Sequence, residues 1–431
     1  MADFSDVSGM AAITVQPVGA PLRGQAAPPG SKSITNRVLL LAALARGTSR
    51  ITGAHTSLDT QLMADALRQM GVTVEEPDAT SFTVTSPGRL QRPEGPLYLG
   101  NAGTAMRFLS ASVSLVNGTV VVDGDGHMRK RPIGPLVEAL RAVGIAAQDT
   151  DGCPPVTVEG TGHFGAGRVE IDGGLSSQYV SALLMAAPCA TGPVEVALTG
   201  AQIGARGYVD LTLAAMRRFG AQVEQIDART WRVEPTGYRA ADVHVEPDAS
   251  AATYLWAAQA LTGGAIDIGT KAADFTQPDA AAAEVITQFP HLPAEIDGSQ
   301  MQDAIPTIAV LAAFNTTAVR FTGIENLRVK ECDRTAALAT ELNGIRPGLA
   351  EEQGDDLVVH SDPGLAGQHL PARIETYADH RIAMSFALAG LKIHGITILD
   401  PACTGKTWPG YWAMLAGLGV SLTPEPEMAT P

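Results

Sequence analysis

The chain has 431 residues, of which 45% are hydrophobic and 17% charged, and its net charge is −15. This length exceeds what one hydrophobic core usually organises, so we expect two domains. The acidic balance disfavours a nucleic-acid partner, which would need a basic surface, and any anionic ligand must be held by a local cluster of cations.

The cysteines and the first residues of the chain predict a cytoplasmic protein. Cys153, Cys189, Cys332 and Cys403 lack metal-binding or disulfide-framework spacing, so we expect free thiols in a reducing compartment. The opening MADFSDVSGMAAITV is acidic where a signal peptide would be basic. No apolar run approaches the ~18 residues of a membrane span, so we expect no membrane association.

The first polar motif is PPGSKSITNR at residues 28–37, directly before an apolar helix. It does not fit a nucleotide P-loop, because Ser31 separates Gly30 from Lys32. Two interpretations remain open at this point. The serine is a plain helix N-cap, or Lys32 and Arg37 flank an anion site at the helix N-terminus.

A longer pattern recurs along the chain: an apolar helix, a turn with Gly, a β-branched strand, and a second helix that ends at Gly. The first helices are NRVLLLAALA, AMRFLSASVS, QYVSALLMAA, AATYLWAAQA, AIPTIAVLAA and DHRIAMSFAL. Each is apolar on all sides and should be buried. Six such α/β units predict three per domain, with a boundary near HVEPDAS at residues 244–250.

Polar residues gather just before each of these buried helices. The segments are GSKSITNR, LGNAGTAMR, GGLSSQYV, VEPDASAA, SQMQDAIP and TYADHRIA. A second group precedes other helices, in GHMRKRPIG, ENLRVKECDR and CTGKTWPG. Helix N-termini that point at one region would favour the binding of anions.

Seven of these motifs, in this order, resemble those of the 5-enolpyruvylshikimate-3-phosphate synthase family. They are PGSKSITNR, LGNAGTAMR, RPIGPLVEALR, LSSQYVSALLMAAP, NLRVKECDRTAALATEL, TYADHRIAMSFAL and CTGKTWPGY, and they span about residues 28 to 412. The resemblance implies an α/β fold of two domains, each with three βαβαββ repeats about a pseudo-threefold axis. One domain would comprise residues 29–245 and the other residues 1–28 plus 246–431, with the active site in the cleft between them.

The resemblance also implies the reaction. The enolpyruvyl group of phosphoenolpyruvate is moved to the 5-hydroxyl of shikimate 3-phosphate, and phosphate is released, on the route to aromatic amino acids. We expect a monomer that needs no cofactor, since no His/Cys/Asp cluster has metal-ligand spacing and no G-x-G-x-x-G follows a strand. The expected partners are the two small-molecule substrates alone.

The resemblance assigns most polar motif residues to one substrate or both. For shikimate 3-phosphate the matching positions are Lys32, Ser33, Arg37, Ser176, Ser177, Gln178, Asp303, Asn326 and Lys330. For phosphoenolpyruvate they are Lys32, Gly103, Arg131, Gln178, Arg334, Arg381 and Lys406. Hydroxyl and amide groups suit ring hydroxyls, and guanidinium groups suit carboxylate and phosphate.

Two carboxylates are expected to move the protons. Asp303 would accept the proton of the attacking hydroxyl, and Glu331 would protonate the methylene carbon of the enolpyruvyl group. Glu331 stands three positions before Arg334, a spacing that places two side chains on one face of a helix. A general acid needs a raised pKa, whereas cationic neighbours lower it, and the sequence leaves this balance open.

The chain departs from the family pattern at two positions. Ala205 stands where the family has a serine, with Arg206 beside it, which puts one phosphate contact in doubt. Phe108 stands where many members have proline. We therefore expect the family inhibitor glyphosate to compete with phosphoenolpyruvate more weakly than in members with proline.

Two rival functions are weaker. The sister transferase that acts on UDP-N-acetylglucosamine has a reactive cysteine in the loop that here is DGDGHMRKRPIG, without cysteine. A non-catalytic anion-binding protein would have no use for an acid and base, yet Asp303 and Glu331 are both present.

Overall fold

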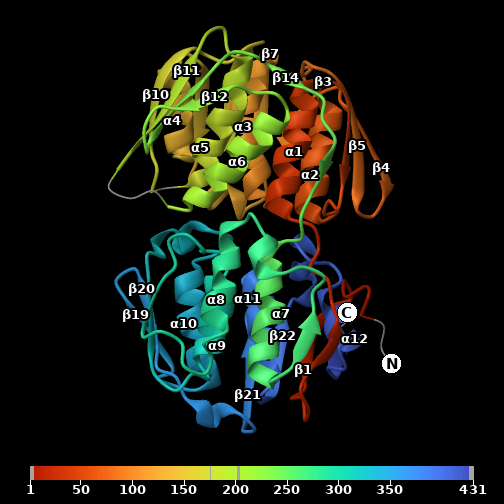
Figure 1. Ribbon diagram of the computed structural model, residues 1–431, viewed down its shortest axis with the longest axis vertical. Helices are drawn as coiled ribbons and strands as arrows, with labels where there is room; N and C mark the ends of the chain where they lie inside the picture. Colours follow the sequence, from red (N-terminus) through yellow and green to blue (C-terminus); the bar gives the residue numbers. More distant parts are fainter. Residues whose placement is uncertain (1–3, 175, 201–203, 427–431) are drawn as a thin grey trace, which may run out of the picture. The chain divides into compact units, whose positions relative to one another are not determined.

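The computed structural model describes residues 4–174, 176–200 and 204–426. Contacts divide the chain into two compact units, Gly30–Glu246 and a unit made of Met1–Pro29 with Pro247–Pro431. Both are α/β assemblies, and their elements are labelled in Figure 1. In the described ranges, no helix is long and apolar enough to cross a membrane.

The unit Gly30–Glu246 consists, in its described residues, of three modules with one pattern. The first has α1 (Lys32–Leu44), β3 (Ala45–Thr52), α2 (Leu58–Gln69), β4 (Thr73–Asp78) and β5 (Ser81–Pro87). The second has β6 (Leu97–Tyr98), α3 (Gly103–Ser112), β7 (Asn117–Asp123), α4 (Gly134–Ala142), β8 (Ala146–Thr150) and β9 (Cys153–Thr161). The third has β10 (Gly167–Asp172), α5 (Ser177–Ala186), β11 (Val194–Thr199), α6 (Arg206–Arg218), β12 (Val223–Gln225) and β13 (Thr230–Val233), and β14 (Tyr238–Arg239) and β15 (Val243–His244) follow.

Each module of this unit forms a small mixed sheet with one strand order. In the second, β6 lies parallel to β7, and β7, β9 and β8 then pair antiparallel, with Val120 opposite Val158. The order β10-β11-β13-β12 repeats this arrangement, with Val196 opposite Trp231. The first module takes its parallel partners, β14 and β15, from the end of the unit. The repeat predicted from the sequence is thus confirmed as a structural repeat.

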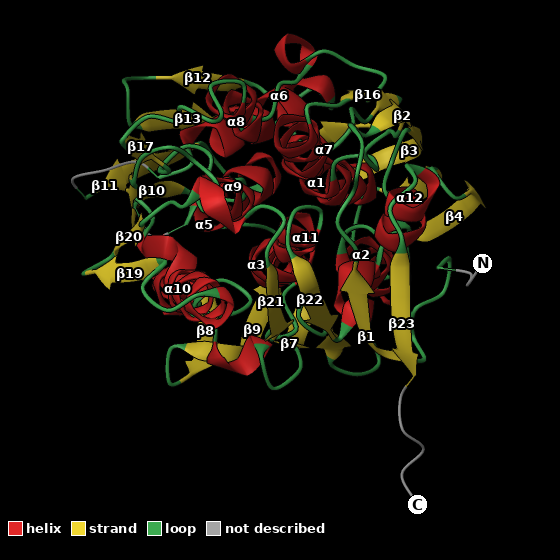
Figure 2. Cartoon of the chain, turned by 90° about the horizontal axis from the view of Figure 1, so that it is seen from below, coloured by secondary structure: helices red, strands yellow, loops and turns green. Residues whose placement is uncertain are grey.

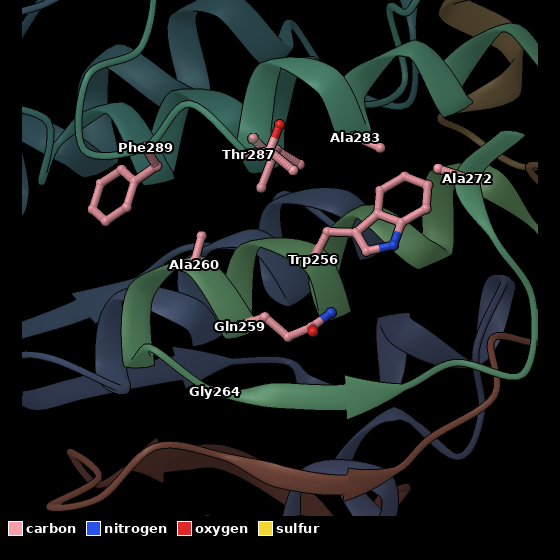
Figure 3. Close-up of a pocket in the computed structure, with 9 residues that line it drawn as sticks. Trp256, Gln259, Ala260, Gly264, Ala272, Ala283, Thr287 and Phe289 are labelled. Carbon is pink, nitrogen blue, oxygen red and sulfur yellow. The ribbon is translucent and has the colours of Figure 1, made fainter.

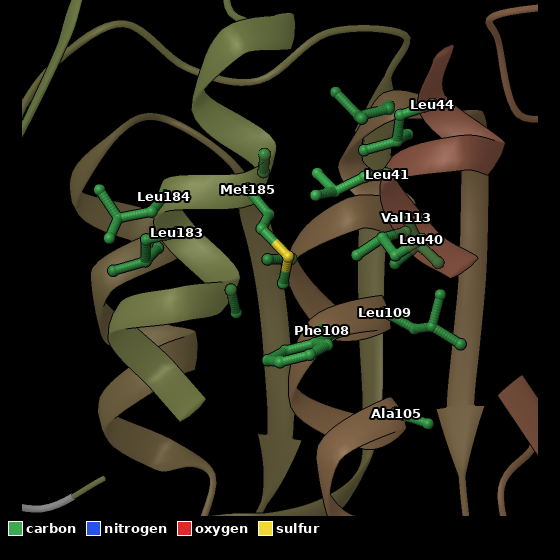
Figure 4. Packing of buried hydrophobic residues seen from close by; sticks show 14 of the residues in the cluster. Leu40, Leu41, Leu44, Ala105, Phe108, Leu109, Val113, Leu183, Leu184 and Met185 are labelled. Atoms are coloured by element: carbon green, nitrogen blue, oxygen red, sulfur yellow. The ribbon is translucent and has the colours of Figure 1, made fainter. Parts of the chain in front are cut away.

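The first helix of each module lies in the core of the unit. α1, α3 and α5 are almost wholly buried, and α3 packs against both of the others. Figure 4 shows Leu40 and Leu41 of α1, Phe108 of α3 and Leu183 of α5 in this core. Burial of each such side chain contributes about 1.5–3 kcal/mol, so the apolar helices hold the module sheets around them.

The other unit follows the same plan with longer connections. Its helices are α7 (Ala249–Thr262), α8 (Ala282–Ile286), α9 (Ile305–Ala312), α10 (Arg334–Ile345), α11 (His380–Gly390) and α12 (Tyr411–Gly417). Its strands are β1 (Met10–Val15), β2 (Arg23–Gln25), β16 (Ala265–Asp267), β17 (Glu295–Asp297), β18 (Val319–Thr322), β19 (Ala350–Gln353), β20 (Asp356–Val359), β21 (His369–Ile374), β22 (His394–Leu399) and β23 (Leu422–Pro426). Short 3-10 helices of the chain are η1 (Val113–Leu115), η2 (Met128–Lys130), η3 (Ala187–Cys189), η4 (Ala272–Asp274), η5 (Pro278–Ala281), η6 (Glu325–Val329), η7 (Pro363–Leu365) and η8 (Pro401–Lys406).

Two sheets of this unit repeat the strand order of the modules, and a third is shorter. The orders are β17-β18-β20-β19 and β21-β22-β1-β23, and the second sheet is visible from below in Figure 2. Its strand β1 comes from the N-terminus and places Ile13 opposite Ile398. The third sheet is the pair β16-β2, and α8 is a helix of only 5 residues. Glycines and prolines between residues 263 and 290 interrupt the elements here.

Candidate active site

The motif GSKSITNR both caps a helix and presents a buried cation. The Ser31 hydroxyl accepts a hydrogen bond from the N–H of Ile34 over 3.3 Å, so the N-cap interpretation is confirmed. Lys32 is buried in the first turn, and its Nζ lies 3.4 Å from Oδ2 of Asp59. Ser33 follows it on α1 and is half-buried. An N-cap therefore does not exclude an anion site, because the lysine is held at the same helix end.

The second and third modules contribute the starts of α3 and α5. Ser176 caps α5 by accepting from the N–H of Gln178 over 3.2 Å, and Ser177 is the first residue of the helix. The side-chain amide of Gln178 donates to the hydroxyl of Thr104 over 3.3 Å. This bond joins the N-terminal ends of α5 and α3, which the sequence predicted to carry polar groups toward a common region.

Gly103 and Arg131 depend on each other. A Cβ atom at Gly103 would lie 2.7 Å from Nη2 of Arg131, so the missing side chain leaves room for the guanidinium at the start of α3. Nη1 of Arg131 donates to Oδ1 of Asn101 over 3.0 Å. Arg131 itself is buried. The glycine therefore positions an arginine, whereas the sequence had suggested only close approach of a ligand.

Arg37 is bonded inside the unit. Its Nε donates to Thr212 over 2.7 Å, Nη1 donates to the carbonyl of Ser33 over 2.8 Å, and Nη2 lies 3.3 Å from the hydroxyl of Ser181. Its guanidinium also lies 5.2 Å from the ring centroid of Phe108. Burial lowers the pKa of Arg37 to about 10. Through these contacts Arg37 links α1 to α3, α5 and α6. Direct contact of Arg37 with a substrate stays a prediction.

Arg206, the residue after Ala205, does not take over the role of the serine that the family has at position 205. Ala205 has a left-handed backbone with φ of 49° and no capping side chain. Arg206 donates to the carbonyl of Ala228 over 2.7 Å, and its guanidinium lies 4.8 Å from the ring centroid of Trp231. Its charge is thus placed over an aromatic ring of β13. In this chain, Arg206 is a poor substitute for a phosphate-binding hydroxyl.

In the unit that contains residues 247–426, buried and half-buried charges of both signs form one cluster. Its members are Asp303, Glu331, Arg334, Asp379, Arg381 and Lys406. Arg334 is 1% exposed and bonds three carboxylates. Burial alone would lower the pKa of Arg334, but the carboxylates raise it well above its ordinary value. The cluster is stable only as a set, because each buried charge needs its partners.

Asp303 lies between two guanidinium groups. Nη1 of Arg334 donates to its Oδ1 over 3.0 Å, and Nη2 of Arg381 donates to its Oδ2 over 2.9 Å. Burial lowers the pKa of Arg381, but the Asp303 carboxylate, together with Tyr254 and Asp248, raises it overall. Both cations favour an ionised Asp303.

Glu331 is bonded by the same arginine and by a lysine. Nη2 of Arg334 donates to its Oε2 over 2.8 Å, and Nζ of Lys406 lies 2.9 Å from its Oε1. The expectation that Glu331 and Arg334 share a helix is wrong, because Asp333 caps α10 and the helix begins at Arg334. The ion pair forms nevertheless, with Glu331 in the turn before the helix.

Asp379 is the member of this cluster that the sequence did not single out. It is fully buried, and it accepts from Nε of Arg334 over 2.7 Å and from the backbone N–H of Arg381 over 2.8 Å. It is also the N-cap of α11. An Asp directly before an apolar helix is a capping signal, and that signal could have identified it.

Asn326 and Lys330 lie near each other in the chain at η6 and just after it. Oδ1 of Asn326 is buried without a hydrogen-bond partner in the described part of the chain. Such an atom is costly unless something else bonds it. Lys330 is half-buried. Both positions suit contact with a polar ligand, which stays a prediction.

A separate cavity of about 420 Å³ lies between α7 and α8. Trp256 and Gln259 of α7 lie across from Ala283 of α8 and from Thr287, the residue after α8 (Figure 3). The remaining lining residues are Ala260, Gly264, Ala272, Ile286 and Phe289. No charged side chain lines it. The cavity therefore does not suit multiply anionic ligands, and none of the predicted site residues belongs to it.

The described residues contain no group of three or more His, Cys, Asp or Glu side chains that could hold a metal ion. The four cysteines are free thiols. Burial raises the pKa of Cys189 to about 12, so its thiolate is disfavoured at neutral pH.

Comparison with known proteins agrees with this geometry. The family model described as EPSP synthase (3-phosphoshikimate 1-carboxyvinyltransferase) matches residues 17–415. The 3-phosphoshikimate 1-carboxyvinyltransferase of Rhizobium etli (strain CIAT 652) is 70% identical over 411 residues, 95% of this chain and 98% of the relative. The enzyme of the same name from Pseudomonas savastanoi pv. phaseolicola (strain 1448A / Race 6) is 65% identical over 410 residues, with the same shares.

Solved structures agree in fold. An EPSP synthase from Acinetobacter baumannii has a TM-score of 0.76 and 25% identity, and the alignment covers 96% of this chain and 99% of that one. The enolpyruvyl transferase NikO from Streptomyces tendae also has a TM-score of 0.76, at 18% identity, over 97% of this chain and 100% of that one. At that identity the second likeness supports the fold alone.

Proposed function

We propose the roles of the site residues from one premise: the chain belongs to the EPSP synthase family, so it is a 3-phosphoshikimate 1-carboxyvinyltransferase. It moves the enolpyruvyl group of phosphoenolpyruvate to the 5-hydroxyl of shikimate 3-phosphate in the shikimate pathway. One observation supports the roles most strongly. Arg334 bonds both Asp303 and Glu331, and two carboxylates held by one cation are suited to paired proton transfers.

Phosphoenolpyruvate is proposed to bind to the cations of the charged cluster and to the helix ends of the other unit. Arg334 and Arg381 carry planar guanidinium groups that can bond carboxylate or phosphate through two N–H groups. An incoming anion would compete with Asp303 and Glu331 for these donors. The proposed contacts are Lys32, Gly103, Arg131, Gln178, Arg334, Arg381 and Lys406.

Shikimate 3-phosphate is proposed to bind mainly through hydroxyl, amide and ammonium groups. The buried, partnerless Oδ1 of Asn326 would gain a hydroxyl donor from the ring. Ala205 offers no hydroxyl to the phosphate, so the remaining contacts must hold it. The proposed contacts are Lys32, Ser33, Arg37, Ser176, Ser177, Gln178, Asp303, Asn326 and Lys330.

The proposed reaction is addition followed by elimination. In the addition, Asp303 takes the proton of the 5-hydroxyl, whose oxygen bonds C2 of phosphoenolpyruvate, and Glu331 gives a proton to C3. In the elimination, a proton leaves C3 for Glu331, the C2–C3 double bond re-forms, and phosphate departs with the C–O electron pair. Between the two steps, Lys406 and Arg334, which both bond Glu331, would stabilise the carboxylate that it becomes after giving up its proton.

Release of inorganic phosphate tests this function. The protein should release phosphate from phosphoenolpyruvate only when shikimate 3-phosphate is present, and replacement of shikimate 3-phosphate by UDP-N-acetylglucosamine should give none. Phosphate release from phosphoenolpyruvate alone, at the same rate, would contradict the proposed reaction.

Substrate binding is expected to join the two units. The proposed contacts of shikimate 3-phosphate belong to both, and an anion bonded by both stabilises whichever arrangement brings them together. Addition of shikimate 3-phosphate alone should therefore reduce the radius of gyration in small-angle X-ray scattering, whereas shikimate should do so less. An unchanged scattering curve at saturating ligand would count against this prediction.

Phe108→Pro is expected to increase inhibition by glyphosate and to lower stability. Phe108 is fully buried in the middle of α3, where its N–H group would bond a carbonyl four residues back. Proline there removes the donor and the ring below Arg37, at a cost of about 3 kcal/mol or more. Inhibition constants and thermal melting of both proteins check this. Phe108→Leu, which keeps the N–H group, is the control, and unchanged inhibition of the folded proline variant would contradict it.

We also propose that the protein is cytoplasmic and monomeric, with its two substrates as its ligands. The free thiols support this location. Light scattering after size exclusion would give a mass near 44.7 kDa for a monomer.

A further inference from the structure

The hydroxyl of Tyr254 is a buried polar group that packing does not explain. Tyr254 lies on α7 and is 1% exposed. In the described residues, its Oη atom has no partner within hydrogen-bond geometry. A buried hydroxyl without a partner lowers stability, and phenylalanine would fill the same space without this cost. The oxygen atom therefore calls for a functional explanation.

A neighbouring tyrosine shows the ordinary situation. The rings of Tyr254 and Tyr411 meet edge to face, with centroids 5.8 Å apart and an interplanar angle of 73°. Tyr411 donates its hydroxyl to the carbonyl of Met384 over 2.8 Å. The two tyrosines therefore differ in their hydroxyl groups. In the described residues, the Tyr411 hydroxyl has a hydrogen bond of full geometry and the Tyr254 hydroxyl has none.

Tyr254 is adjacent to the buried charged cluster. Its helix α7 packs against α11, which carries Arg381 in its first turn. Burial raises the pKa of Tyr254, and the charge of Arg381 is the largest influence in the opposite direction, followed by that of Arg334. A side-chain hydrogen-bonding contact with Arg381 acts in the same direction, so the Tyr254 oxygen is close enough to Arg381 to become its acceptor, although the contact falls short of full hydrogen-bond geometry.

Two N–H groups of Arg381 point at Asp303. Nη2 donates to the carboxylate over 2.9 Å, and Nη1 lies 3.3 Å from the backbone carbonyl of the same residue. The two N–H groups that point at Asp303 cannot bond a substrate oxyanion while they stay there. Asp303 is also a weak base while two guanidinium groups bond it, because both stabilise its ionised form. For Asp303 to accept a proton readily, Arg381 must turn at least partly away from it.

We propose that Tyr254 is a positioning residue for this turn: its hydroxyl oxygen accepts a hydrogen bond from Arg381 when an anionic substrate draws the guanidinium from Asp303. This inference rests on the roles proposed above for Arg381 and Asp303. The bond holds the turned guanidinium against phosphoenolpyruvate and leaves Asp303 free to accept a proton. It also gives the Tyr254 hydroxyl the fully formed hydrogen bond that it lacks.

Tyr254→Phe tests the inference, with Tyr411→Phe as the matched control. Tyr254→Phe should raise KM for phosphoenolpyruvate about 10- to 150-fold, as expected for a lost hydrogen bond to a charged group. KM for shikimate 3-phosphate should change less than about twofold, and Tm should stay the same or rise because no hydroxyl is left unsatisfied. Tyr411→Phe should lower Tm and leave the ratio of the two KM values unchanged.

Arg381→Lys separates this inference from the function on which it rests. If Tyr254 acts through Arg381, Tyr254→Phe should add no further increase in KM for phosphoenolpyruvate in the Arg381→Lys background. An unchanged KM in Tyr254→Phe, beside a raised KM in Arg381→Lys, overturns the role of Tyr254 alone. An unchanged KM in Arg381→Lys overturns the proposed role of Arg381, and the inference with it.

Discussion

Exchange of either proton-transfer carboxylate for its amide should lower kcat by about 10²- to 10⁴-fold, the usual contribution of a positioned acid or base. Asp303→Asn and Glu331→Gln keep the size of the side chain and remove its ability to carry a proton. Both residues form ion pairs with the buried Arg334, so each variant also leaves the arginine with one carboxylate fewer. Steady-state kinetics of phosphate release measure the loss, and a variant with near-normal kcat would show that its role is assigned wrongly.

Solvent hydrogen exchange distinguishes the two roles. In deuterated water, reversible protonation at C3 places deuterium in the methylene group of phosphoenolpyruvate. Glu331→Gln should abolish this exchange because the donor itself is gone. Asp303→Asn should slow it only through slower addition, so exchange should remain measurable after long incubation with shikimate 3-phosphate. The opposite pattern would reverse the two assignments.

Local sequence patterns were sufficient for the repeat and its buried helices. Segments such as QYVSALLMAA are apolar on every side, so burial was the only stable environment for them, and α5 is buried as predicted. The pairing of distant strands could not be derived in this way. β1 lies between β22 and β23, and β3 lies beside β14 and β15. These pairings depend on tertiary contacts that leave no local signal in either strand.

The polar ends of the helices were predictable, but their bonding was not. The sequence indicated cations near Lys32, Arg131 and Arg334, where the structure has them buried. It did not show that Arg37 would donate to Thr212 and Ser181, or that Asp379 would bond Arg334. A guanidinium group finds its acceptors through packing of helices far apart in the chain. The charge of an arginine and its position in a motif can therefore be read from the sequence, but the acceptors that it bonds cannot.

Arg334→Met should destabilise the unit around residues 247–426 by about 3–5 kcal/mol, the cost of removing one partner from a buried set of charges. Methionine fills much of the same space, but it carries no charge. The carboxylates of Asp303, Glu331 and Asp379 would then outnumber the cations of the cluster. The site is shielded from solvent, since Arg334 is 1% exposed. Urea unfolding followed by tryptophan fluorescence suits this test, since Trp256, Trp408 and Trp412 belong to that unit.

The control for Arg334→Met is Arg320→Met, which removes an arginine paired with Asp356 at the surface, with a side chain that is 46% exposed. Its cost should be within about 1 kcal/mol, because solvent screens an exposed pair and hydrates the remaining carboxylate. Asp379→Asn combined with Arg334→Met should recover part of the lost stability, since it removes one of the uncompensated charges. Equal costs for the two arginine variants would mean that water or rearrangement compensates the buried carboxylates. Arg334 would then act in substrate binding and catalysis without also maintaining the fold.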